Sequence, residues 1–140
     1  MQQFTATMNL ALELAAMSAQ LTKRVDSPLS FHGISFTEFL VMHHLSLANQ
    51  QCMRRVDLAN KIGLSASGIT RLISPMEKIG LVQKQKNPRD ARVSLVKLSE
   101  SGERIFNEAR VTFEQSCDSV FESLSDDEIQ QLRKLAVKLV

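Results

Sequence analysis

The pattern of residues 58–102 constrains the fold of this chain more than any other feature. Apolar residues at helical spacing lead up to Gly63-Leu64-Ser65, and a second helical pattern follows. Glycine readily takes the left-handed conformation that closes a helix, and serine is a favoured first residue of the next one. Two short helices joined by such a turn form a helix-turn-helix.

Residues 82–98 change to the alternating pattern of β-strands. We expect strands at residues 82–86 and 92–98, joined by the turn-forming sequence Asn87-Pro88-Arg89-Asp90. A β-hairpin directly after a helix-turn-helix makes a winged helix. The predicted fold is therefore mainly α with a small β-hairpin wing, flanked by N- and C-terminal helices.

Long amphipathic helices are predicted on both sides of this unit. Residues 4–25 contain neither proline nor glycine, and Asp26-Ser27-Pro28 is expected to end their helix. Ser99 is the predicted N-cap of a helix lasting to about Leu124, and a capping box at Ser125 opens the last helix. The apolar faces of the first and last helices need a partner, from the same subunit or another.

Two further expectations concern the interior of the chain. A capping box at Ser35 predicts a nearly apolar helix to about Ala48, which should be central and buried. Pro75 lies within the second helix of the helix-turn-helix. An interior proline loses a hydrogen bond and clashes with the preceding turn at a cost of about 3 kcal/mol, so we expect a bend or break near Ser74.

Positive charge is concentrated in the middle of the chain. The formal net charge is only +2, but residues 54–92 hold nine basic and three acidic side chains, which gives +6 and leaves −4 for the remainder. A basic middle between acidic ends is typical of a module that binds a polyanion. An uneven solvated surface is the alternative explanation of the same pattern.

Other functional classes find little support in the sequence. The 140 residues fit one domain that needs no disulfide or metal, and the well-separated Cys52 and Cys117 favour a reducing, cytoplasmic setting. No signal peptide or membrane-spanning run is recognisable. Because phosphate-binding glycine loops, metal-ligand pairs and nucleophile motifs are also missing, we expect neither an enzyme nor a cofactor.

Five short motifs occur in order between residues 56 and 109. They are Asp57-Leu58-Ala59, residues 63–73 (GLSASGITRLI), residues 76–82 (MEKIGLV), Asp90-Ala91-Arg92 and residues 98–102 (LSESG). This ordered set resembles the MarR family of bacterial transcription regulators. The resemblance implies a homodimer whose terminal helices intertwine and whose two winged helices read a pseudo-palindromic operator on double-stranded DNA. It also implies repression that a small aromatic or phenolic compound, or an oxidant, relieves.

The resemblance further implies how a single domain of residues 1–140 is divided. Residues 30–106 would be the DNA-binding lobe, and residues 1–29 and 107–140 would be dimerisation helices. The sequence departs from the common family pattern at Pro75, where many relatives have a charged residue, and at Ala91, where a second arginine is frequent.

The expected DNA contacts lie on the second helix of the helix-turn-helix and around the wing. Short side chains allow close approach to the major groove, and the residues expected there are Ser65, Ser67, Gly68, Thr70, Arg71 and Ser74. Arg71 would bind guanine or phosphate, and Arg89 would enter the minor groove. The remaining expected contacts, mainly with phosphates, are Arg54, Arg55, Lys78, Lys84, Lys86 and Arg92. Asp90 should pair with a nearby arginine such as Arg92 and brace the wing.

An effector site is expected between the first two helices and the winged lobe. Its expected lining residues are Met17, Leu21, Phe36, Leu40, His43 and His44, with core packing as the alternative role of each. His43 and His44 point about 100° apart on a helix, so they cannot share one metal ion. Two functional alternatives remain: a redox sensor in which Arg54 and Arg55 lower the pKa of Cys52, or a winged helix that contacts only proteins.

Overall fold

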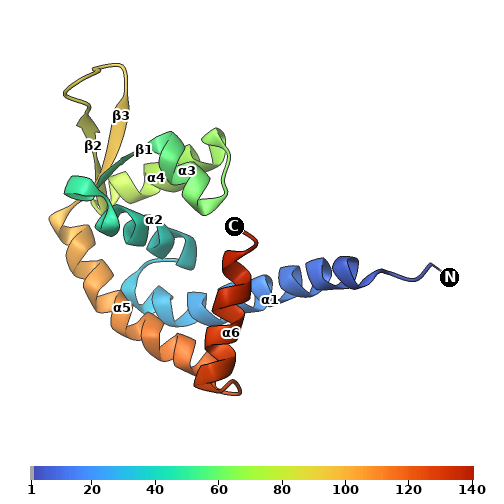
Figure 1. Cartoon of the computed structure of the whole chain (residues 1–140). Coiled ribbons are helices and arrows are strands. Elements are labelled where there is room, and N and C mark those ends of the chain that lie inside the picture. Colours follow the sequence, from blue (N-terminus) through green and yellow to red (C-terminus); the bar gives the residue numbers. More distant parts are fainter. Residues whose placement is uncertain (1) are drawn as a thin grey trace.

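Helices dominate the computed structural model, which describes residues 2–140 (Figure 1). Within these residues the helices and strands follow in the order α1 (Ala6–Leu29), η1 (Ser30–His32), α2 (Phe36–Leu47), η2 (Asn49–Gln51), β1 (Cys52–Arg54), α3 (Arg55–Ile62), α4 (Ala66–Lys78), β2 (Val82–Lys86), β3 (Ser94–Leu98), α5 (Glu100–Val120) and α6 (Asp126–Val137). The predicted mainly α fold with a helix-turn-helix and a wing is confirmed.

The turn between α3 and α4 forms as the sequence predicts. Gly63 has a φ of 81°, and its N–H donates to the Ala59 carbonyl oxygen to close α3. The Ser65 hydroxyl accepts a hydrogen bond of 3.1 Å from the Gly68 N–H, which caps the start of α4. Because the apolar stripe of α4 is buried, its opposite face is turned to solvent.

The wing belongs to a three-stranded antiparallel sheet with the strand order β1-β3-β2. Met53 in β1 and Lys84 in β2 both pair with Val96, which is fully buried in the central strand. The predicted hairpin of β2 and β3 is confirmed, but the sequence did not predict the third strand, β1. A strand of three residues is too short to show an alternating pattern, and its pairing partner lies more than forty residues away. Strand β3 also begins at Ser94, two residues later than expected.

Both prolines expected to interrupt helices lie inside them. Pro28 is one residue from the end of α1, and the Ser30 N–H still bonds to the Asp26 and Pro28 carbonyl oxygens. Helix α4 continues through Pro75 to Lys78, so the expected break near Ser74 is absent. Ile73 and Met76 on either side of Pro75 are fully buried, and we infer that their packing outweighs the lost hydrogen bond.

Helix α2 is the central helix of the core, as predicted. Val41, Met42 and Leu45 are fully buried, and a capping box at Ser35 fixes the helix start. The Phe39 ring lies against two phenylalanines of α5, with centroid distances of 5.1 Å to Phe106 and 4.7 Å to Phe113. Stacked and tilted aromatic rings therefore contribute to the contact between α2 and α5.

Helix α5 is fixed to the turn that follows α4. The Ser99 hydroxyl contacts the carbonyl oxygens of Gly80 and Leu81 at 2.6 and 3.0 Å, and it caps α5 through the Gly102 N–H at 2.9 Å. A Cβ on Gly102 would overlap the Leu81 carbonyl group. The end of the helix-turn-helix and the start of α5 thus touch backbone to backbone.

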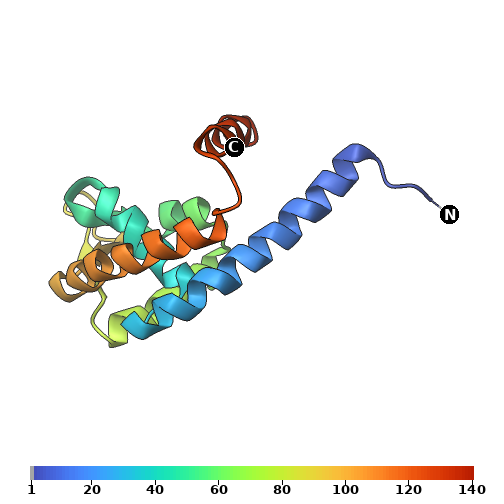
Figure 2. The same ribbon diagram turned by 90° about the horizontal axis from the view of Figure 1, so that it is seen from below.

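The two ends of the chain extend away from this core (Figure 2). Helix α1 buries only Val25 and Leu29, near its C-terminal end, and α6 buries no residue. The predicted capping box at Ser125 is present, whereas α5 ends at Val120 rather than near Leu124. Within residues 2–140, no helix combines the length and apolar character that crossing a membrane requires.

Candidate nucleic-acid interface

The solvent face of α4 begins with small and polar side chains. Ser65, Ser67, Thr70, Arg71 and Ser74 are exposed, and Gly68 is half-buried beside the Ser65 cap. The Thr70 hydroxyl donates to the Ala66 carbonyl oxygen at 3.1 Å, and Arg71 Nε contacts the Ser67 carbonyl oxygen at 3.4 Å. These bonds hold the side chains along the helix, and the Arg71 guanidinium keeps further donors for another partner.

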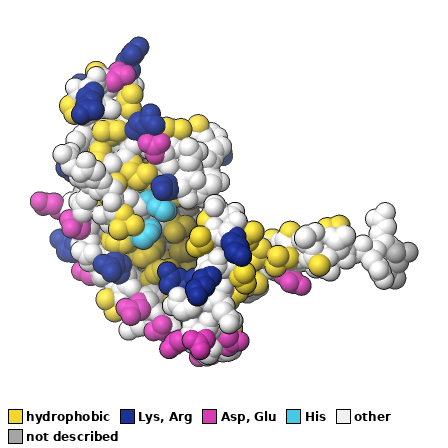
Figure 3. Space-filling model, viewed as in Figure 1, with side chains coloured by type: hydrophobic (Ala, Val, Ile, Leu, Met, Phe, Trp, Pro, Cys, Tyr) yellow, Lys and Arg dark blue, Asp and Glu magenta, His cyan; other side chains and the backbone are white. Residues whose placement is uncertain are grey.

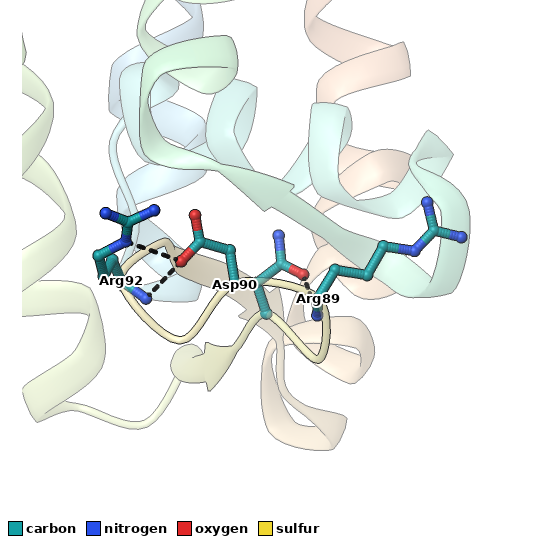
Figure 4. Close-up of polar contacts among 4 residues, drawn as sticks. Arg89, Asp90 and Arg92 are labelled. Carbon is teal, nitrogen blue, oxygen red and sulfur yellow. Dashed lines mark hydrogen bonds and ion pairs between the residues drawn. The ribbon is translucent and has the colours of Figure 1, made fainter.

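The wing tip combines one paired and one unpaired arginine (Figure 4). Asp90 Oδ1 accepts from the Arg92 backbone N–H at 3.0 Å and from Arg92 Nε at 3.2 Å. The Asn87 side chain accepts from the Arg89 backbone N–H at 2.9 Å, and the Arg89 side chain extends away from Asp90 (Figure 4). No ion pair involves Arg89 within residues 2–140.

Each acidic residue of the basic middle segment is paired with an arginine. Arg54 binds Asp57 through Nε at 2.9 Å and Nη2 at 3.1 Å, and this contact raises the pKa of Arg54 and lowers that of Asp57. Glu77 accepts from Arg55 Nη2 at 2.8 Å, and Asp90 holds Arg92 as described above. Three arginines are therefore already neutralised by carboxylates of this chain.

The other basic residues of the segment are the charges free to attract a polyanion. Six have no ion pair within the described part of the chain: Lys61, Arg71, Lys78, Lys84, Lys86 and Arg89. They lie on α3, α4, β2 and the wing tip. Basic side chains are visible on the projecting wing in Figure 3. Lys61 was not among the expected contacts, although its position in the basic segment could have suggested it.

A hollow of about 820 Å³ lies between α2 and α5. Figure 3 shows an apolar depression beside histidine side chains. Of the six residues expected to line an effector site, His43 lines this hollow. Phe36 instead packs on Phe113 at a centroid distance of 5.7 Å, and Met17 is exposed on α1. The sequence reading missed the polar lining residues from α5: Asn107, Arg110 and Glu114.

The adjacent histidines of α2 lie in a partly buried, positively charged environment. The rings of His43 and His44 are 5.0 Å apart between centroids. Burial lowers the pKa of His44, and the nearby His43 and Lys61 lower it further. Residues 2–140 contain no cluster of three His, Cys, Asp or Glu side chains able to hold a metal ion.

The environment of Cys52 differs from that expected from its neighbours in sequence. Burial raises the pKa of its thiol, and Lys97, its partner in the sheet, offsets part of this effect. The expectation that Arg54 and Arg55 lower this pKa was wrong, because burial is the largest effect and the charge that lowers the pKa is that of Lys97. Both arginines are bound to carboxylates. Burial also raises the pKa of Cys117, with Asp118 adding to the effect. Both thiols are thus less ionised at neutral pH than free cysteine.

Comparison with known proteins gives a consistent result. Residues 34–94 match the MarR family. The transcriptional regulator YsmB of Bacillus subtilis is 37% identical over 83 residues, which are 59% of this chain and 57% of that relative, less than two thirds of its length. The regulator SarZ of Staphylococcus haemolyticus is 28% identical over 125 residues, covering 88% of this chain and 81% of SarZ.

Solved structures have the same fold. A mutant MarR from E. coli, crystallised in complex with operator DNA, superposes with a TM-score of 0.88 at 22% identity and covers 100% of this chain and 99% of that one. AbsC of Streptomyces coelicolor, also a MarR family transcriptional regulator, gives a TM-score of 0.84 at 23% identity, covering 96% and 93%. Together with the helix-turn-helix and wing, these matches show that the chain has the fold of MarR family transcriptional regulators and that residues 34–94 are similar to that family.

Proposed function

We propose that this protein is a bacterial, cytoplasmic repressor that binds a pseudo-palindromic operator on double-stranded DNA as a homodimer. Residues 30–106 of each subunit would contact DNA, and residues 1–29 and 107–140 would join the subunits. The observation that carries the proposal is the set of six cations on the helix-turn-helix and wing that form no ion pair within residues 2–140, beside the exposed start of α4. A wing used only for protein contacts would not need this charge.

The proposed contacts divide into reading and positioning roles. The start of α4 would enter the major groove, where Arg71 can reach a guanine or a phosphate. Arg89 would enter the adjacent minor groove. Lys78, Lys84 and Lys86 would bind phosphates and contribute affinity without sequence preference. The crystallised complex of the E. coli relative with operator DNA supports this assignment by analogy of fold.

The exposed apolar faces of α1 and α6 support the homodimer. Leu135 and Leu139 of α6 are 57% and 70% exposed, and Met8 and Leu12 of α1 also face solvent. Isolated surface leucines are common, but apolar residues repeated along two projecting helices indicate an interface. Burying these faces against a second copy of the chain would remove them from water.

Footprinting on DNA upstream of the protein's own gene tests the proposal. A dimer should protect two half-sites on one face of the duplex, with centres separated by roughly 34–36 Å or a multiple. Analytical ultracentrifugation of the free protein should give twice the mass of one chain. Absence of any protected region, or protection of a single half-site by a monomer, would contradict the proposal.

A small aromatic effector is proposed to occupy the hollow between α2 and α5. Phe39, Phe106 and Phe113 supply ring surfaces, and His43 and Arg110 supply polar groups suited to a phenol or a carboxylate. Titration of the protein–DNA complex with benzoate or phenol should release DNA, and Arg110→Gln should remove the response to benzoate. If neither probe changes DNA affinity in the wild type, the effector proposal is wrong.

A further inference from the structure

One ion pair of the basic segment joins two helices instead of two neighbouring residues. Arg55 is the first residue of α3, and its Nη2 lies 2.8 Å from Oε1 of Glu77 near the end of α4. The two residues are separated by 22 positions in sequence. The contact therefore connects the beginning of the first helix of the helix-turn-helix with the end of the second.

This pair is also the most protected of the three. The side chains of Arg55 and Glu77 are each 22% exposed, whereas Arg54 and Asp57 are 51% and 45% exposed. Exposed ion pairs are weakened by solvent and salt, while a partly buried pair keeps more of its attraction. Removing one partner of such a pair leaves the other charge poorly solvated, which favours movement of the helix that carries it.

The position of the pair connects the recognition helix with the wing. Strand β1 ends at Arg54, directly before Arg55, and it is hydrogen-bonded to the wing strand β3. On the other side, Glu77 lies in the last turn of α4, shortly before strand β2 begins at Val82. The pair thus spans the junction at which α4 and the sheet that carries the wing meet.

We propose that the Arg55–Glu77 ion pair sets the angle between α4 and the wing, and that Arg55 is a positioning residue and not a phosphate contact. The inference rests on the proposed DNA-binding function. A dimer that reads the major groove with α4 and the minor groove with the wing needs both elements at a fixed separation. If the separation of α4 and the wing varies, affinity for the correct sequence falls more than affinity for DNA in general.

The two possible roles of Arg55 predict different effects of Glu77→Gln on the ratio of specific to non-specific affinity. If Arg55 contacts phosphate, removing the nearby carboxylate makes the surface more positive and raises affinity for every duplex, so the ratio stays unchanged. If Arg55 positions α4, the same change lowers the ratio, because affinity for the specific duplex also depends on the angle of α4. Arg55→Gln also separates the roles, because losing a phosphate contact reduces the slope of log affinity against log salt by about one unit.

The experiment first selects a duplex with the wild-type protein from a pool of random-sequence duplexes. Fluorescence anisotropy then measures affinity for this duplex and for a scrambled one, at several salt concentrations and at a temperature where circular dichroism shows every variant folded. Glu77→Gln and Arg55→Gln should each reduce the ratio of specific to non-specific affinity by roughly tenfold, comparable to one mismatched base pair. The salt slope should stay at its wild-type value.

Two further variants complete the test. Asp57→Asn breaks the exposed pair between Arg54 of β1 and Asp57 of α3 and should leave the specificity ratio unchanged. The double variant Arg55→Glu with Glu77→Arg keeps the net charge and should recover most of the lost specificity. An unchanged ratio in folded Glu77→Gln, a flatter salt slope in Arg55→Gln, or no recovery in the double variant overturns the inference alone. Failure of the wild type to enrich any duplex overturns the proposed function, and this inference with it.

Discussion

Arg89 and Arg92 lie three residues apart in the wing but have different surroundings. Arg92 is held by Asp90, whereas Arg89 has no ion pair within the described residues. An unpaired guanidinium can exchange its counterions for DNA phosphates without first losing a carboxylate partner. Of the wing arginines, Arg89 is therefore the one from which we expect most of the salt-dependent affinity.

Arg89→Ala should weaken operator binding and flatten the slope of log affinity against log salt by about one unit. The measurement is a titration of labelled operator at several salt concentrations. Arg104→Ala, which removes an exposed arginine from α5, serves as the matched control and should retain the wild-type slope. Equal slopes for the wild type and Arg89→Ala would rule out a phosphate contact by Arg89.

His44 should make the stability of the fold depend on pH. Its pKa is lowered in the folded chain by burial and by the charges of His43 and Lys61. Between that lowered pKa and the ordinary value of about 6.5, the unfolded chain binds the proton more readily, so protonation favours unfolding. The free energy of unfolding should therefore fall as pH decreases below about 6.5.

Urea unfolding of the wild type and His44→Gln at about pH 7.5 and about pH 5.5 checks this expectation. The wild type should lose more stability between these two conditions than the variant, which lacks the titrating group. The same loss in both proteins would assign the pH dependence to other residues.

At the scale of helices and strands, predictions succeeded where the signal was local. The serine caps of α4, α5 and α6 and the pairing of Asp90 with Arg92 each involve residues at most three positions apart. Strand β1 and the Arg55–Glu77 pair could not be predicted, because their partners are distant in sequence. The helix ends expected at the two prolines were not found, because the local backbone preference of proline does not account for side-chain packing such as that around Pro75.

The first turns of α4 and α5 offer a matched pair of glycines. Gly68 and Gly102 each donate their backbone N–H to the serine that caps their helix. A Cβ on Gly68 would meet the Ser65 hydroxyl oxygen at 3.2 Å, whereas a Cβ on Gly102 would overlap the Leu81 backbone. The Ser65 hydroxyl can shift slightly. The backbone at Leu81 cannot, because the Ser99 hydroxyl is hydrogen-bonded to the carbonyl oxygens of both Gly80 and Leu81.

Gly102→Ala should therefore lower the free energy of unfolding by about 3 kcal/mol, the upper range for overpacking in a core. Gly68→Ala should change it by less than about 1 kcal/mol, because better helix propensity offsets the tight contact. Chemical denaturation of both variants makes the comparison. A similar stability for the two would show that α5 can move away from the turn after α4 at little cost.

At the scale of the whole molecule, the sequence predicted a winged helix flanked by N- and C-terminal helices, and the order of the elements confirms it. It did not predict which residues meet in the hollow between α2 and α5. Arg110 and His43 come from helices whose relative rotation is decided by the packing of Phe39 on Phe106 and Phe113. The hydrophobic pattern of the sequence identifies the buried face of each helix. It does not determine how the two helices are aligned and rotated against each other.

The proposed dimer gives the whole molecule a property that neither subunit has. Two winged helices joined in one dimer bind two half-sites more tightly than either does alone, because the second contact becomes intramolecular once the first has formed.

Leu135→Lys places a charge on the exposed apolar face of α6 and should produce monomers. Its affinity for a duplex with two half-sites should fall toward that for a single half-site, while the single-site affinity stays at the wild-type value. Lys134→Ala, on the neighbouring position of α6, is the control and should leave mass and affinity unchanged. A Leu135→Lys protein that remains dimeric in sedimentation would show that this face of α6 does not join the subunits.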